Sequence, residues 1–196
     1  ISPAILVEVR DAGGNRDTNF TSNVVLSFGS NAAGATLSGT TTVAAVAGRA
    51  TFSNISLDKV GTGFTLQATA VPMSAITSNS FAITPGATDH LSFTTGPQNT
   101  TGGTAFGTSI VVRAYDALNN LATGFTGNVV AAIGTNPSTG VLSGTKTVAA
   151  VAGVATFAGL SIDKAGTGYT LTMASSGLST ITSSTFDAAV GAATQL

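Results

Sequence analysis

A long internal repeat constrains the fold of this chain more than any other feature. Residues 37–52 read LSGTTTVAAVAGRATF, and residues 142–157 read LSGTKTVAAVAGVATF. The spacing of 105 residues holds without a gap between residues 1–91 and 106–196, where 43 of the 91 aligned positions are identical. A repeat of this length is about the size of one domain. We therefore expect two domains with the same fold.

The repeat also sets the expected domain boundaries. They are residues 1–85 for the first module, 86–90 for a linker, 91–190 for the second module and 191–196 for the start of a linker to a following repeat. Pro85 and Gly86 mark the connection as a turn. Residues 91–105 have no counterpart in the first module, because Ile1 aligns with Phe106. We therefore expect the first module to lack its opening strand.

Short runs of β-branched and aromatic residues recur through both modules, separated by Gly, Asn and Asp, and they predict strands. In the second module the expected strands are residues 90–96, 109–116, 125–134, 141–151, 154–162, 169–174 and 178–188, with a polar loop at 96–103. About seven strands in roughly 100 residues, with turns every 8–12 residues, are typical of an all-β sandwich.

Alternation within the strands predicts which side chains form the core. Phe52 and Phe157 share an Ala-x-Phe spacing, so we expect both to face the opposite sheet. Two other strands give the remaining assignments: Ile110, Val112, Ala114, Tyr169, Leu171 and Met173 inward, and Arg113, Tyr115, Thr170 and Thr172 outward.

The composition favours a folded protein with an uncharged polar surface. Charged residues make up 8% of the chain and the net charge is −1, whereas 43% of the residues are hydrophobic. Disordered chains show the opposite balance. Seven Lys and Arg residues, spread singly, provide no basic patch for nucleic acid.

Cysteine is absent, which excludes disulfides and thiolate chemistry. We expect no membrane span, and the Thr, Ser and Gly content favours an extracellular location.

Four motifs occur in the same order in both modules. They are VRDAGGN and AYDALNN at residues 9–15 and 114–120, TLSGTTTV and VLSGTKTV at 36–43 and 141–148, GRATF and GVATF at 48–52 and 153–157, and GTGFTLQAT and GTGYTLTMA at 61–69 and 166–174. In this order they resemble the bacterial immunoglobulin-like domains of the invasin/intimin type, which occur in tandem on surface adhesins. The Asp-Lys pairs before GTG depart from the family pattern by lengthening the loop. The resemblance implies two tandem immunoglobulin-like β-sandwiches in a rod-forming extracellular protein, without catalytic residues.

Two functions remain open at this point. The first is a structural repeat module of an extracellular or cell-surface protein that forms a rigid stalk, surface layer or filament, with neighbouring copies or repeats as head-to-tail partners. The alternative is an adhesive binding module that recognises a glycan, receptor or other surface through Thr-rich strands or loops. Aromatic residues make up 6% of the chain and Trp is absent, which disfavours glycan binding.

Asp11, Asn15 and Asp17 provide an oxygen-rich spacing that could hold Ca²⁺. The second module keeps Asp116 and Asn120 but lacks the second aspartate. The alternative is an Asx-type turn that closes a hairpin. Because the ligand sets are incomplete, we expect no metal and no cofactor.

Other polar residues have a structural alternative as well. His90, the only histidine, could be a pH switch or a metal ligand, or a solvated linker residue. Asp58-Lys59 and Asp163-Lys164 recur in both modules and are typical of a surface ion pair in a turn, which leaves these lysines badly placed for a covalent cross-link to Asn.

Asn19, Asn54 and Asn99 match the N-glycosylation pattern, but none is an acceptor in both repeats, so chance matches in a Thr- and Ser-rich chain are the alternative. A nucleophile elbow, a phosphate-binding loop and a facing pair of carboxylates are all missing from the sequence. We therefore expect that the protein is not an enzyme.

Leu91 and Phe93 belong to the strand that has no counterpart in the first module. Two interpretations follow: the chain is part of a longer array, or the first module takes this strand from a neighbouring chain by strand addition. An open sheet edge invites another strand. We expect an isolated chain to be either polymeric or unstable in its first half.

Overall fold

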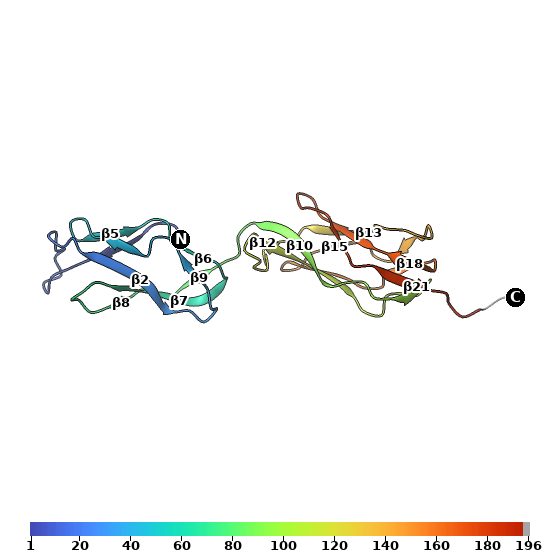
Figure 1. Cartoon of the computed structure of the whole chain (residues 1–196), viewed down its shortest axis with the longest axis horizontal. Helices are drawn as coiled ribbons and strands as arrows, with labels where there is room; N and C mark the ends of the chain where they lie inside the picture. Colours follow the sequence, from blue (N-terminus) through green and yellow to red (C-terminus); the bar gives the residue numbers. More distant parts are fainter. Residues whose placement is uncertain (194–196) are drawn as a thin grey trace. The chain divides into compact units, whose positions relative to one another are not determined.

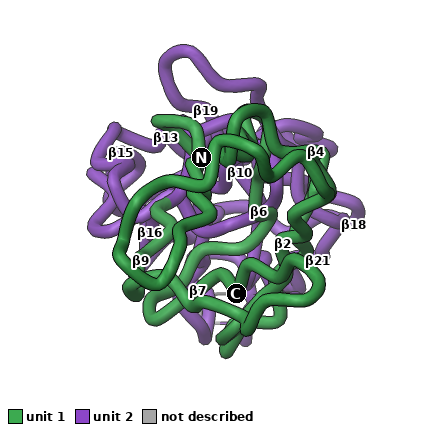
Figure 2. Tube along the Cα trace, turned by 90° about the vertical axis from the view of Figure 1, so that its left-hand side faces the viewer, with its two compact units in different colours: residues 1–84 green, residues 85–196 purple. Residues whose placement is uncertain are grey.

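The computed structural model describes residues 1–193, and none of these residues is helical. No helix in this range could therefore span a membrane. The chain forms two compact units, Ile1–Thr84 and Pro85–Leu196 (Figures 1 and 2). Both units are built from short strands and turns.

The second unit contains the complete set of strands expected from the repeat. They are β10 (Thr88–Thr95), β11 (Thr100–Thr101), β12 (Ile110–Asp116), β13 (Asn128–Ile133), β14 (Leu142–Ser143), β15 (Thr147–Ala149), β16 (Val154–Phe157), β17 (Ser161–Ile162), β18 (Gly166–Tyr169), β19 (Leu171–Ala174), β20 (Ile181–Thr182) and β21 (Phe186–Ala189).

These strands pair as in an immunoglobulin-like sandwich. In one sheet β12 lies between β10 and β16 and is antiparallel to both. The opposite sheet has the order β15-β13-β19-β20, and the last strand, β21, pairs with β18 and, in parallel, with β11. In the immunoglobulin arrangement the first, second and fifth strands form one sheet, and the third, sixth and seventh strands form the other. The predicted fold class is confirmed.

The core of the second unit lies between these two sheets. Ile110, Val112 and Ala114 are buried while Arg113 is exposed, which confirms the predicted faces of β12. Phe157 and the inward residues of β18 and β19 are also buried, as predicted. This core needs no disulfide or metal, because a module of this length buries enough apolar surface by itself.

The first unit repeats this architecture with fewer strands. They are β1 (Ile5–Glu8), β2 (Asn23–Ser30), β3 (Leu37–Ser38), β4 (Thr42–Ala44), β5 (Arg49–Phe52), β6 (Ser56–Leu57), β7 (Gly61–Thr69), β8 (Ile76–Thr77) and β9 (Phe81–Ile83). The order β4-β2-β7-β8, with β9 also on β7, corresponds to the second sheet of the second unit. In the first sheet β1 pairs with β5, and no other described strand joins them.

The most strongly repeated stretch forms a tight hairpin turn in both units. Ala152 and Gly153 connect β15 to β16 with φ angles of 48° and 81°, and Ala47 and Gly48 do the same in the first unit with 49° and 75°. Two successive residues with positive φ are the requirement of a type I′ turn. A Cβ atom on Gly153 would lie 2.6 Å from the carbonyl oxygen of Ala122. The glycine is therefore needed both for its φ angle and for this close approach.

Several details differ from the sequence-based expectations. Three predicted strands, 141–151, 154–162 and 178–188, are each broken into two short strands by a few irregular residues. The polar loop at 96–103 contains β11, and the predicted linker 86–90 contains the start of β10. Of the expected linker at 191–196, residues 194–196 lie outside the described residues.

Thr170 is buried rather than solvent-exposed, so its predicted orientation was wrong. Its backbone position separates β18 from β19. Its hydroxyl oxygen accepts a hydrogen bond of 2.7 Å from the backbone N–H of Thr135. The side chain is buried because it supplies a partner for this loop, which strand alternation alone does not reveal.

Replacing Phe157 by Ala should lower the free energy of unfolding of the second unit by about 3–5 kcal/mol, because it leaves a cavity between the sheets. Both tyrosines of the chain, Tyr115 and Tyr169, lie in this unit. Urea unfolding followed by tyrosine fluorescence therefore reports this unit alone. A loss below about 1 kcal/mol would show that the side chain is not a close-packed core residue.

The two turn residues should respond in opposite directions to substitution. Ala152→Gly should stabilise the second unit by about 0.5–1 kcal/mol, because it relieves an alanine held at positive φ. Gly153→Ala should destabilise it, because it adds both that strain and the clash with Ala122. Equal effects in the same tyrosine-detected unfolding assay would contradict the turn geometry.

Candidate functional site

The strongest candidate site is the outer edge of β1 in the first unit. In the second unit the equivalent strand, β12, is covered on this side by β10. Among the described strands β1 pairs with β5 only, with Ile5 opposite Phe52 and Val7 opposite Ala50. One row of backbone N–H and C=O groups of β1 therefore has no strand partner within residues 1–193. Such an edge is a template for pairing with another strand.

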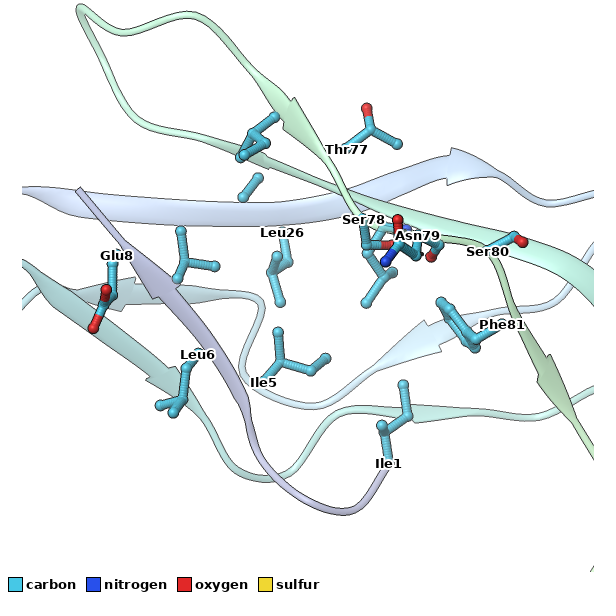
Figure 3. Close-up of a pocket in the computed structure, with 14 residues that line it drawn as sticks. Ile1, Ile5, Leu6, Glu8, Leu26, Thr77, Ser78, Asn79, Ser80 and Phe81 are labelled. Carbon is cyan, nitrogen blue, oxygen red and sulfur yellow. Dashed lines mark hydrogen bonds between the residues drawn. The ribbon is translucent and has the colours of Figure 1, made fainter. Parts of the chain in front are cut away.

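An apolar cavity of about 440 Å³ lies beside this edge. It is bounded by β1 on one side and by the opposite sheet and the segment that runs from β8 to β9 along β7 on the other. Figure 3 shows Ile5 of β1 facing Leu26, with Phe81 and Ile1 at one end and Leu6 and Glu8 on the other side of the strand. The interior of this space is lined mainly by aliphatic and aromatic side chains.

A second cavity of about 270 Å³ continues along β1. It shares Val7, Ala68 and Ile76 with the first cavity and extends to Val9 and Met73. The two cavities therefore form one groove along β1, which we call the β1 groove.

Residues along the β1 groove are less buried than their counterparts in the second unit. Ile5, Val7 and Phe81 are only partly buried. The residues at the same repeat positions, Ile110, Val112 and Phe186, are at most 2% exposed. Leu6 and Ile76 are 55% and 66% exposed. Exposed apolar area that a homologous domain buries marks an interaction surface.

The walls of the β1 groove are held in the same way as in the second unit. The hydroxyl oxygen of Ser78 accepts a hydrogen bond of 3.0 Å from the N–H of Leu66, and Ser183 and Leu171 repeat this bond at 3.0 Å. The backbone nitrogen of Ile1 donates to the carbonyl oxygen of Ile55 at 2.6 Å. In the second unit Phe106 donates to Leu160 at 2.9 Å. The groove is thus shaped like its occupied counterpart.

A second strand edge is open in the first unit. In the second unit β21 pairs in parallel with β11, with Thr100 opposite Ala188 and Thr101 opposite Ala189. The equivalent strand β9 pairs with β7, and no other described strand adjoins it. Residues 88–101 of the second unit therefore cover two edges whose counterparts are both open in the first.

The outer face of β1 carries an ion cluster next to the exposed side chain of Leu6. Glu8 accepts hydrogen bonds of 2.7 Å from Arg49 and 2.7 Å from Arg10. Arg16 lies 4.0 Å from the same carboxylate. The hydrogen bond from Arg49, with that from Arg10, lowers the pKa of Glu8. The cluster is exposed, so it contributes little stability, but it makes this face polar around Glu8.

Asp11 and Asn15, two of the calcium candidates, form a turn. Asp11 accepts hydrogen bonds from the backbone N–H of Asn15 at 2.8 Å and from its side-chain amide at 3.2 Å. The backbone bond lowers the pKa of Asp11. Asp17 accepts instead from the N–H of Asn19 at 3.0 Å. Among residues 1–193, no three His, Asp or Glu side chains gather as a metal group, and the expectation of no metal stays a prediction.

The counterpart Asp116 is buried and more heavily bonded. Its carboxylate accepts from the backbone N–H groups of Gly86 at 2.9 Å, Leu118 at 3.0 Å and Asn120 at 2.8 Å. Burial by itself would raise the pKa of Asp116, but these hydrogen bonds outweigh burial and leave the pKa below its usual value. Asp116 therefore ties the start of the second unit to the end of β12.

The other predicted site residues lie apart from the β1 groove. His90 is in β10 rather than in a linker, where its ring bonds Asp89 at 3.0 Å and stacks on Tyr115. Asp58 accepts a hydrogen bond from the N–H of Thr36, which lowers its pKa, and Asp163 accepts one from Val141. Both acids therefore accept hydrogen bonds from loop backbone groups.

The three glycosylation candidates are exposed. Asn54 donates its side-chain amide to the hydroxyl of Thr40 at 3.0 Å, and Asn99 accepts from the N–H of Asp187 at 2.9 Å. Asn19 lies in the turn that follows Asp17. Glycosylation at these positions stays a prediction.

Leu91 is buried in the second unit, and Phe93 packs against its core. Sequence reasoning identified this strand but missed residues that line the β1 groove in the first unit, above all Leu26, Leu66 and Phe81. An alignment of the two repeats would identify these lining residues only if one already knew which residues of the opposite sheet face β10. That information lies in the three-dimensional packing.

Comparison with known proteins gives only distant likenesses. No family model matches the sequence, and no curated protein matches it. Among solved structures, the D00-D0 domain of intimin is 15% identical and covers 94% of this chain and 98% of its own, with a TM-score of 0.46. A glycosyl hydrolase family 2 member from Bacteroides cellulosilyticus is 9% identical over 85% of this chain and 22% of its own, with a TM-score of 0.43.

A β-glucuronidase from glycoside hydrolase family 2 is 18% identical over 96% of this chain and 19% of its own, with a TM-score of 0.42. The chain thus spans about a fifth of the length of these hydrolases. Its immunoglobulin-like assignment rests on its own strand pairing.

Replacing Asp116 by Ala should lower the free energy of unfolding of the second unit by about 1–3 kcal/mol, because it leaves buried N–H groups without acceptors. Since the pKa of Asp116 is lowered in the folded state, its stabilising effect is present above pH about 4 and is lost as the pH falls through that lowered pKa. Tyrosine-detected urea unfolding from pH 7 to 2 measures this loss. The exposed Asp11→Ala variant is the matched control, and it should leave the tyrosine signal unchanged.

Proposed function

We propose that the chain is a structural segment of an extracellular or cell-surface protein, in which immunoglobulin-like modules follow one another in a stalk, surface layer or filament. We propose no catalytic activity. Its partners are further modules of the same kind.

The observation that carries this proposal is the role of the repeated polar residues. Side chains kept in both modules bind turn backbones. Asn31 accepts from the N–H of Ala35 at 2.8 Å and donates to its carbonyl at 2.7 Å, and Asn136 makes the same pair of bonds with Gly140 at 2.7 and 2.8 Å. Asp58 and Asp163 likewise accept from loop N–H groups.

These repeated groups are therefore used to hold the sandwich together. A module selected for binding or catalysis would retain exposed side chains that converge on one place. Here many of the repeated positions are core residues, turn glycines and turn acceptors, and the exposed repeated valines Val46 and Val151 lie beside the hairpin turns. This distribution supports a module whose shape is its function, and the near absence of charge on the surface suits packing in series.

The test uses the full-length protein on the cells that make it. Residues 85–190 are deleted in one variant and replaced by an unrelated immunoglobulin-like domain of equal length in another. Antibody raised against the folded chain should label intact cells. Deletion should reduce the distance to which the protein extends from the cell surface. Replacement should restore this distance, together with any attachment of the cells to other surfaces.

Two outcomes would contradict the proposal. Labelling only after cells are opened would place the protein inside the cell. Attachment lost on replacement, although length is restored, would show that these residues bind a surface themselves, which is the adhesive alternative.

A further inference from the structure

We infer that the β1 groove of the first unit binds a β-strand of the β10 type that is supplied by another repeat of this kind. The strand runs antiparallel to β1 and inserts a Leu and a Phe, two residues apart, into the groove. This inference goes beyond the proposed function and does not depend on where the protein is located, because it concerns binding between purified segments.

The second unit fixes the expected register. In β10 Leu91 lies opposite Ala114 and Phe93 lies opposite Val112. Moving back by the repeat of 105 residues places the Leu opposite Val9 and the Phe opposite Val7. Val9 lines the cavity of about 270 Å³, and Val7 lies where this cavity and that of about 440 Å³ meet. Each incoming apolar side chain therefore has space beside the residue it faces.

The β1 groove offers partners both for the backbone and for the apolar side chains of such a strand. The edge of β1 supplies backbone donors and acceptors, and the cavity supplies apolar surface, with Ile5, Leu26 and Phe81 around it (Figure 3). Strand addition draws affinity from main-chain hydrogen bonds and specificity from pockets for alternate side chains. An apolar cavity of about 150 Å³ already takes up a benzene molecule, so this groove is large enough for a phenylalanine ring.

The neighbouring edge extends the same binding surface. The loop after β10 leads into β11, which pairs in parallel with the last strand of the second unit. The open edge of β9 is the equivalent place in the first unit. A segment that matches residues 86–105 could therefore cover both edges at once.

The occupant is a strand from another repeat and not β10 of a second copy of this chain. Leu91 is only 3% exposed in its own unit. A second copy that donated its β10 to the β1 groove would lose β10 from its own second unit. An equivalent groove would then open beside its β12. The exchange would bring no net gain in buried apolar area, whereas a strand from a further repeat carries no such cost.

The experiment compares three chains: the 196-residue chain, the chain with a copy of residues 86–105 appended before Ile1, and the same extended chain with Leu91→Asp and Phe93→Asp in the appended copy only. The appended copy ends at the position that precedes Phe106, the counterpart of Ile1. The native 196 residues are unchanged in all three, so loss of folding cannot explain a difference.

Far-UV circular dichroism follows both units, and tyrosine fluorescence follows the second unit, because both tyrosines lie there. The appended copy should raise the melting temperature of the first unit by about 5 °C or more and leave the tyrosine transition in place. The Asp variant should melt like the original chain. Equal melting of all three chains would overturn the inference.

Cross-linking tests the register, since the chain contains no cysteine of its own. Ser92 lies opposite Arg113, whose counterpart is Glu8. With Ser92→Cys in the appended copy, Glu8→Cys should form a disulfide and Arg10→Cys should form much less. Equal yields would show that the segment does not pair with β1 in this register.

Sedimentation of the unmodified chain decides the source of the strand. We expect a monomer up to about 100 µM, and a 20-residue peptide of sequence 86–105, added separately, should bind it one to one. Self-association of the chain that the appended copy abolishes would show that a second copy fills the groove, and it would overturn the choice of occupant.

Discussion

The pairing of an opening strand with the outer edge of the second strand decides how completely each sandwich of this chain is closed. In the second unit β10 covers β12, and the residues beneath it are among the most buried in the chain. In the first unit β1 has the same sequence pattern and the same partner on its other side. Its apolar residues nevertheless remain partly exposed beside a cavity of about 440 Å³. In strand pairing, the opening strand over this edge is what separates the two units.

The remaining structure shows how a chain with few charges keeps its turns. Asp and Asn side chains accept backbone N–H groups in loops, and pairs of residues at positive φ close the hairpins. These local bonds explain why the repeat conserves small polar residues and glycines as strictly as core residues. Asp116 does the same in the second unit, since its buried carboxylate holds the turn that follows β12 and the segment that leads into β10.

The fold and the existence of an open edge could be predicted from the sequence, because alternation and the 105-residue repeat are local or linear signals. The faces of β12 and the burial of Phe157 followed from the period of two. The burial of Thr170 could not be predicted, because it depends on a bond to the loop at Thr135. The walls of the β1 groove also required the structure, since Leu26 and Phe81 come from strands that pair with β7 in the opposite sheet.

Native-state hydrogen exchange of the unmodified chain in dilute solution shows whether the outer edge of β1 is open. Amide groups of β1 which do not bond to β5 should exchange much faster than the equivalent amides of β12, because only the latter are covered by an opening strand. Equal protection of β1 and β12 would contradict this expectation, since the edge of the first unit would then be closed.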